Sequence, residues 1–220
     1  METVLPNGAQ DIKPEDTNKL RYSVRQNDGS GFVFINNYQD HVENEDKKNE
    51  SIDLELDNEN LRIPYNGGFD LDKEESCILP FNLNIKNILL KTATVQLITK
   101  VGGNKEAYFF YQPRGMKPEY VFDEDTIKDI QISKGTINKV NGSVIVHPES
   151  SEITKVTLTD LNDEQIDLYT LTNEQSLNFW KFNYGERDNV ILSSAQLLVD
   201  NNGLRFESSD NEIKIKVING

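Results

Sequence analysis

The side chains best suited to acid–base chemistry are three groups of neighbouring carboxylates. These groups are Glu74-Glu75, Asp123-Glu124-Asp125, and Asp160 with Asp163 and Glu164. Two carboxyl groups can act as general acid and general base where an apolar pocket raises the pKa of one above that of the other. All three groups lie among polar turn residues, where water relieves the repulsion between charges. We therefore expect solvated loop charges and assign no catalytic residue.

Histidine and cysteine chemistry has little support in the sequence. His41 and His147 are far apart, and neither has a second histidine at the spacing of a metal site. The order of residues leaves a Ser–His–Asp triad open, but the chain has no Gly-x-Ser-x-Gly nucleophile motif. The single cysteine, Cys77, stands beside apolar residues without a neighbouring base, so we expect it to be buried and unreactive.

Oxygen-rich turns and aromatic rings are the remaining candidates for binding. The segments 70–72 and 200–203 could offer oxygen atoms to Ca²⁺, yet neither has the twelve-residue ligand spacing of an EF-hand. We predict no metal site and no cofactor. Exposed aromatic rings can stack on a sugar ring, and the candidates for such a contact are Tyr111, Tyr120, Trp180 and Tyr184. For Trp180, packing of a helix against a sheet is the more common alternative.

The charge balance narrows the classes of partner. The chain has 23 basic and 37 acidic residues, a net charge of −14, and no stretch that concentrates lysine and arginine. Nucleic acids and anionic membranes, which bind clustered positive charge, are therefore poor partners. The sequence has no apolar run long enough to span a membrane and no basic-then-apolar start typical of a signal peptide. We predict a soluble protein and assign no compartment.

The elements that must position these residues are β-strands. Residues 20–25 and 31–36 flank a turn, Asn27-Asp28-Gly29-Ser30, and so predict a hairpin. Alternating apolar residues predict a second hairpin from 52–56 and 61–63. The acidic stretch 43–50 between the two hairpins is expected to be a solvated loop.

Strands and turns continue to the end of the chain. Apolar or alternating runs predict further strands at 77–81, 92–99, 107–111, 120–122, 128–132, 136–140, 143–147, 153–158, 165–169, 195–199, 204–207 and 213–217, with turns at 102–104 and 200–203. The aromatic run 107–111 is dense enough to be buried on both faces. A capping box, Thr172-Asn173-Glu174-Gln175, predicts one short helix over 173–181 that carries Phe179 and Trp180.

This pattern predicts an all-β fold of antiparallel sandwich or jelly-roll-like sheets. Residues 1–19 are expected to form a linker or an edge segment. Residues 20–125 form a first β domain, and residues 126–220 form either a second β domain or a continuation of the same sheets.

Several stretches match a known family in type and order. They are 14–25, Gly31-Phe32-Val33-Phe34-Ile35-Asn36-Asn37-Tyr38-Gln39-Asp40-His41, Ile78-Leu79-Pro80-Phe81-Asn82-Leu83, 90–97, and Gly115-Met116-Lys117-Pro118-Glu119-Tyr120-Val121-Phe122. The chain resembles the region that follows the catalytic barrel in bacterial family 35 glycoside hydrolases, which are mostly β-galactosidases. The resemblance is specific over residues 14–125 and looser from 165 to 217.

The resemblance implies a role beside a catalytic domain. In that family a (β/α)₈ barrel carries the two catalytic glutamates, and such a barrel would be the partner of this chain. Because this sequence predicts a single helix, none of its residues is matched to those glutamates. The chain would then be a non-catalytic β region that supports the barrel, with residues 108–111 and the surroundings of Tyr120 facing it.

Two other functions stay open. A freestanding carbohydrate-binding module would expose an aromatic pair on one sheet face and would bind galactosides. A structural or protein-interaction β protein would expose an apolar patch and would have no affinity for sugars.

Overall fold

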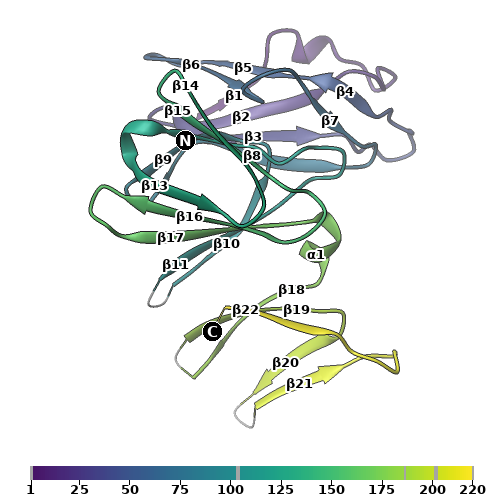
Figure 1. Cartoon of the computed structure of the whole chain (residues 1–220). Helices are drawn as coiled ribbons and strands as arrows, with labels where there is room; N and C mark the ends of the chain where they lie inside the picture. Colours follow the sequence, from purple (N-terminus) through teal and green to yellow (C-terminus); the bar gives the residue numbers. More distant parts are fainter. Residues whose placement is uncertain (1, 103–104, 186, 201–202, 220) are drawn as a thin grey trace.

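Alternating apolar residues place most of the chain in strands, and these pair into a central eight-stranded antiparallel sheet (Figure 1). The computed structural model describes residues 2–102, 105–185, 187–200 and 203–219. The strands of the sheet, in spatial order, are β1 (Glu2–Val4), β2 (Arg21–Asn27), β3 (Ser30–Asn36), β8 (Ser76–Ile85), β9 (Ile88–Ala93), β12 (Tyr120–Asp123), β15 (Ser143–Pro148) and β14 (Gly135–Val140). The segment before residue 20 includes β1, which lies at one edge of this sheet.

A five-stranded sheet packs against one half of the central sheet. Its strands, in spatial order, are β10 (Gln96–Val101), β11 (Glu106–Tyr111), β17 (Gln165–Leu171), β16 (Thr154–Asp160) and β13 (Ile127–Ile132). All neighbours are antiparallel except β11 and β17. Apolar side chains from both sheets form one continuous core, which we call the sandwich core: Ile85, Ile88, Leu90, Ala93, Val95, Tyr108, Phe110, Tyr120, Phe122, Val144, Val146, Val156, Leu158, Ile166 and Leu168. The predicted all-β sandwich is confirmed.

The two sheets continue through residue 125. Strand β12 pairs with β15, and β11 pairs with β17, so strands from both sides of that position share each sheet. A short 3₁₀ helix, η2 (Glu124–Thr126), connects β12 to β13 at this position. A second 3₁₀ helix, η1 (Ala9–Asp11), follows β1. Residues 127–171 are therefore a continuation of the same sheets.

Two short two-stranded sheets cover the other face of the central sheet, above β3 and β8 in Figure 1. One pairs β4 (Lys47–Glu50) with β7 (Phe69–Leu71), and the other pairs β5 (Ile52–Glu55) with β6 (Asn60–Ile63). Their apolar side chains meet the inward side chains of β3 and β8 in what we call the hairpin core: Val33, Ile35, Ile52, Leu54, Leu61, Ile63, Phe69, Leu71, Cys77, Leu79, Phe81 and Met116.

Strand β8 supplies side chains to both cores. Cys77, Leu79 and Phe81 belong to the hairpin core, whereas Leu83 and Ile85 pack in the sandwich core. Between them Asn82 has a φ of 46°, a left-handed conformation that asparagine adopts more readily than most residues. This residue interrupts the regular pleat at the point where the strand passes from one core to the other.

The last part of the chain forms a smaller unit. Strands β18 (Phe179–Tyr184), β19 (Arg187–Ser193) and β22 (Ile215–Asn219) make one sheet, and β20 (Gln196–Asp200) pairs with β21 (Gly203–Glu207). Val190 and Leu192 join Phe109 and Leu171 of the five-stranded sheet in a third core. Residues 103–104 and 201–202 of the predicted turns lie outside the described residues.

Three sequence predictions are wrong. The acidic stretch 43–50 contains strand β4, and Lys47 is buried because the carbonyl oxygens of Thr17 and Glu45 accept hydrogen bonds from its ammonium group. The predicted strand 92–99 is divided between β9 and β10, which belong to different sheets.

The third wrong prediction is the extent of the helix. The capping box at Thr172 and Gln175 is present, but the helix it begins, α1 (Asn173–Leu177), ends before Phe179. Phe179 and Trp180 lie in strand β18. Aromatic residues favour strands, and here pairing with β19 outweighs continuation of the helix.

Candidate functional site

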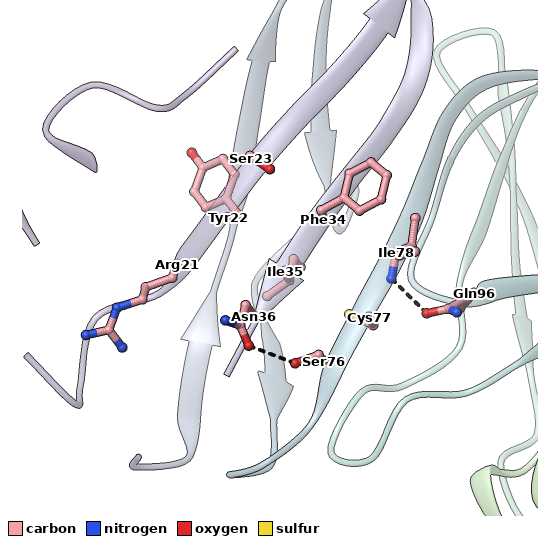
Figure 2. Close-up of a pocket in the computed structure, with 10 residues that line it drawn as sticks. All are labelled: Arg21, Tyr22, Ser23, Phe34, Ile35, Asn36, Ser76, Cys77, Ile78 and Gln96. Carbon is pink, nitrogen blue, oxygen red and sulfur yellow. Dashed lines mark hydrogen bonds between the residues drawn. The ribbon is translucent and has the colours of Figure 1, made fainter. Parts of the chain in front are cut away.

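A shallow hollow lies on the outer face of β2, β3 and β8, opposite the hairpin core. Its volume is about 490 Å³, and it is lined by Arg21, Tyr22, Ser23, Phe34, Ile35, Asn36, Ser76, Cys77, Ile78 and Gln96 (Figure 2). Three consecutive residues from each strand line it, together with the first residue of β10. A hollow of this size is in the range of small-ligand sites and of anchor pockets for a partner's side chain.

Strand register decides which side chains reach the hollow. Phe34 lies opposite Ser23 on β2 and opposite Ile78 on β8. Its neighbours Val33 and Ile35 point into the hairpin core, so the alternation of β3 leaves Phe34 on the outer face, where it is partly exposed. Figure 2 shows Phe34 and Ile78 side by side across β3 and β8.

The polar groups around the hollow hydrogen-bond to one another. The Ser76 hydroxyl donates to Asn36 Oδ1 at 3.0 Å, and the backbone N–H of Ile78 donates to Gln96 Oε1 at 2.8 Å (Figure 2). The Tyr111 hydroxyl donates to the same Gln96 oxygen at 3.2 Å. Burial raises the pKa of Tyr111 to about 12, so its hydroxyl stays protonated at neutral pH.

Two arginines of β2 lie at register positions on this face. Arg21 is turned away, because its guanidinium donates to the carbonyl oxygens of Lys13 and Pro14. Arg25 lies opposite Phe32 of β3 and is exposed. Among the described residues, no carboxylate forms an ion pair with Arg25.

A second, narrower cleft contains the only described contact between a histidine and a carboxylate from distant parts of the chain. Glu119 is almost fully buried, and its two oxygens accept from the backbone N–H of Tyr65 at 2.8 Å and contact His147 Nε2 at 3.1 Å. A carboxylate that orients an imidazole is part of a nucleophilic triad. No hydroxyl or thiol of the described residues is hydrogen-bonded to His147, so the arrangement is that of a structural polar pair between β15 and the residue before β12, and the same carboxylate also holds the loop after β6.

The carboxylate groups singled out from the sequence are not all solvated. Asp160 is fully buried and accepts hydrogen bonds from the Asn87 amide at 2.7 Å and from the backbone N–H groups of Asn162 and Glu164. These bonds, the one from Asn87 first, hold the pKa of Asp160 below its ordinary value. Glu75 is also buried, 2.9 Å from Arg114. Both groups are thus satisfied by donors of their own chain: Asp160 holds the turn 160–164, and Glu75 joins the start of β8 to Arg114.

The other members of these groups face solvent. Asp163 and Glu164 form ion pairs with Lys128 and Lys86, and Glu124 pairs with Lys139. For these three the expectation of solvated loop charges is confirmed. They lie too far out on the surface for a low-dielectric pocket to separate their pKa values.

The aromatic residues proposed for sugar contact do not come together. Tyr120 is completely buried and its hydroxyl is 2.7 Å from that of Thr170, so its assignment to a sugar contact is wrong. Trp180 is partly buried and donates from Nε1 to the carbonyl oxygen of Ser193, whereas Tyr184 is exposed at the end of the same strand. Tyr111 alone borders the hollow, through Gln96.

The expected barrel-facing surface at 108–111 and Tyr120 is also wrong. Phe109 and Phe110 are completely buried on opposite faces of β11, in the third core and the sandwich core, which confirms the prediction of burial on both faces. Phe109, Phe110 and Tyr120 fill cores of their own chain and leave no surface for a partner, whereas Tyr111 is partly exposed at the border of the hollow.

Cysteine and metal chemistry find no site among the described residues. Cys77 is buried in the hairpin core, as predicted, and burial raises the pKa of its thiol. His41 is exposed beside Asp40. Over residues 2–102, 105–185, 187–200 and 203–219, no three His, Cys, Asp or Glu side chains are grouped so that they could hold a metal ion.

Sequence reasoning missed the hollow, although a signal for it was present. Phe32, Phe34 and Asn36 alternate with Gly31, Val33 and Ile35, so both faces of β3 are apolar. A strand that is apolar on both faces requires a covering layer on each side. In this chain the two-stranded sheets β4–β7 and β5–β6 cover one face and the other stays open.

No protein-family model matches the chain, and a search of curated proteins finds no match either. Across the described residues, no helix has the length and apolar character needed to cross a lipid bilayer.

Proposed function

We propose that this chain is a non-catalytic β-sandwich region of a β-galactosidase-like glycoside hydrolase, and that it packs on a (β/α)₈ barrel that carries the catalytic glutamates. The support comes from where the family-like stretches lie. They fall on β2, β3, β8, β9 and β12, which are consecutive neighbours in the central sheet. The stretches 31–41 and 78–83, for example, are more than thirty residues apart in the sequence but lie on the adjacent strands β3 and β8.

A region of this kind acts on the enzyme through rigidity. A sheet fixed by a core on each side can hold the loops of an adjoining barrel in place and exclude water from one wall of its substrate site. The polar residues of this chain are used in turns, caps and ion pairs, such as the Glu75–Arg114 pair and the hydrogen bonds to Asp160. In this proposal the barrel carries out the hydrolysis, and this chain contributes no catalytic group.

The test begins with the gene. The reading frame that contains this chain should continue upstream into a barrel, and the complete product should hydrolyse a chromogenic β-galactoside. The 220-residue chain alone should show no turnover in the same assay.

Two results would contradict the proposal. One is a complete reading frame without a barrel. The other is turnover by the 220-residue chain that is lost in Glu119→Gln, because Glu119 and His147 form the described carboxylate–imidazole pair best placed to act without a barrel. Lys48→Gln, an exposed change elsewhere, is the control for general effects of substitution.

A further inference from the structure

We infer that the outer face of β2, β3 and β8 is the surface through which this region docks on the barrel, and that the barrel presents there an apolar side chain beside a carboxylate. This inference rests on the proposed function, since the barrel is the occupant to which it commits. It assigns the contact to a different face from the aromatic run of β11, which is filled by the chain's own cores.

The first argument is the apolar centre of the face. Register places Phe34 between Ser23 and Ile78, and Phe32 between Arg25 and Pro80. Phe32 and Phe34 are both partly exposed, although aromatic residues at the middle of a central strand are ordinarily covered. Central, partly exposed aromatic residues surrounded by polar groups are typical of the energetic centre of a protein interface.

The side chains of the hollow suit a protein partner better than a sugar. A glycan is bound by hydrogen-bonding groups that are free to meet its hydroxyls. Here Asn36, Ser76 and Gln96 are engaged with one another or with the backbone, and Tyr111 donates to Gln96. Beside the Ser23 hydroxyl, the groups left to make contact are the Phe34 ring and the Ile78 side chain, which suit an apolar anchor.

The third argument is charge. None of the ten residues that line the hollow is acidic, in a chain whose net charge is −14. Arg25 is exposed on the same face, and no ion pair joins it to a carboxylate of the described residues. A carboxylate on the partner would pair with Arg25 and would be kept from other parts of this acidic surface by repulsion.

The fourth argument is preorganisation. The inner face of the same strands is held by the hairpin core, in which Val33, Leu79 and Phe81 are completely buried. The backbone below Phe34 therefore needs no ordering when a partner binds, which lowers the entropic cost of association.

Oxidative footprinting of intact proteins tests the inference without separating the barrel. Hydroxyl radicals modify aromatic side chains according to their exposure, so the modification of Phe34 is compared between the 220-residue chain and the complete reading frame. We expect the rate at Phe34 to fall about tenfold in the complete protein, in line with full desolvation of an interface centre. Tyr184, which is exposed on β18, should keep its rate in both and serves as the matched aromatic control.

Two variants of the complete protein complete the test. Arg25→Glu should restore part of the modification at Phe34, and more of it at low salt, because the pair with the partner's carboxylate becomes a repulsion. Phe34→Ser should make Phe32 accessible in the complete protein. Urea unfolding of the 220-residue Phe34→Ser chain shows whether the variant folds, and the Arg25→Glu result stands independently if it does not.

The outcomes are distinguishable. If the complete protein hydrolyses the β-galactoside but Phe34 is modified as fast as in the chain alone, the docking surface is wrong and the proposed function stands. If the reading frame has no barrel, both fail. If lactose alone slows modification of Phe34 in the 220-residue chain, the hollow is a sugar site and the inference is overturned.

Discussion

The two cores joined by strand β8 are closed in different ways. The sandwich core lies between two large sheets, whereas the hairpin core lies between one half of the central sheet and two short two-stranded sheets. On the sandwich side the five-stranded sheet stops beside Ile78, at the first residue of β10, and leaves the outer face of β2 and β3 open. Each face of the central sheet is thus covered over only part of its width, and apart from β8 the covered parts of the two faces lie over different strands.

The comparison teaches that apolar content alone does not mark the inside of this protein. Phe34 and Phe81 are the same residue type on adjacent strands, and one is partly exposed whereas the other is completely buried. The difference comes from the extent of the covering layer. Substitutions at four places in the chain test that explanation.

The first prediction concerns these two phenylalanines. Phe81→Ala should lower the free energy of unfolding by about 3–5 kcal/mol, because it leaves a cavity in the hairpin core. Phe34→Ala should cost about 1 kcal/mol or less in the isolated chain, since its ring already meets water. Urea unfolding followed by tyrosine and tryptophan fluorescence measures both. Equal losses would show that the outer face is covered as well as the inner one.

The second prediction concerns Gly31 of β3, which pairs with Gln26 of β2 and with Phe81 of β8. A Cβ atom at this position would contact the Arg25 carbonyl oxygen and would lie 2.9 Å from the Phe81 ring. Gly31→Ala should therefore lower the free energy of unfolding by about 1–3 kcal/mol through overpacking. Gly102→Ala, where a Cβ atom would meet open space, is the control and should change stability little.

A third prediction concerns the residue at which β8 passes between the cores. Asn82 combines a φ of 46° with hydrogen bonds from its amide to the Gly29 carbonyl oxygen and to Glu59. Asn82→Gly and Asn82→Val both remove these bonds, but only glycine tolerates the backbone conformation. The valine variant should be less stable than the glycine variant by about 1–2 kcal/mol in denaturant unfolding. Equal stabilities would mean that the φ value contributes nothing to the passage between cores.

The smallest effect is expected at Asp160, at the end of β16 in the sandwich. Its folded-state pKa is lowered, so the stabilisation is present above the unfolded pKa of about 4 and is lost as the pH falls through the folded value. In a series of unfolding experiments from pH 6 to about pH 2, Asp160→Asn should be less stable at neutral pH and should lose less stability on acidification. If the stability of the unchanged chain and that of Asp160→Asn fall in parallel as the pH is lowered, Asp160 is not a source of the acid sensitivity.

The sequence predicted the fold class and most strands because the local signals agree with the tertiary structure. Asp28 and Gly29 form a two-residue turn with positive φ values of 52° and 76°, which is the conformation that this pair favours between hairpin strands. The capping box at Thr172 was equally local. Each of these features depends on neighbours within a few residues.

The errors arise where distant contacts decide. Odd-numbered positions from Cys77 to Ile85 are all apolar, and the pattern alone cannot reveal that they enter two different cores. The charge of Lys47 predicted a solvated loop, but the carbonyl oxygen of Thr17, thirty residues earlier, is one of its partners. The hollow could be predicted only in part, because β3 is apolar on both faces but the width of the covering sheet is a property of the whole topology.

Because Cys77 is buried, the rate at which its thiol is labelled can report how often this structure opens. It is the single cysteine of the chain, and its thiol lies in the hairpin core on the strand that pairs with β3. A thiol reagent can reach it only during those moments when β8 separates from its cover, so the labelling rate reports how often that event occurs. Any molecule that binds the opposite face of β8 should make these openings rarer. The slower labelling of Cys77 would be measured by mass spectrometry as a single mass shift that accumulates more slowly.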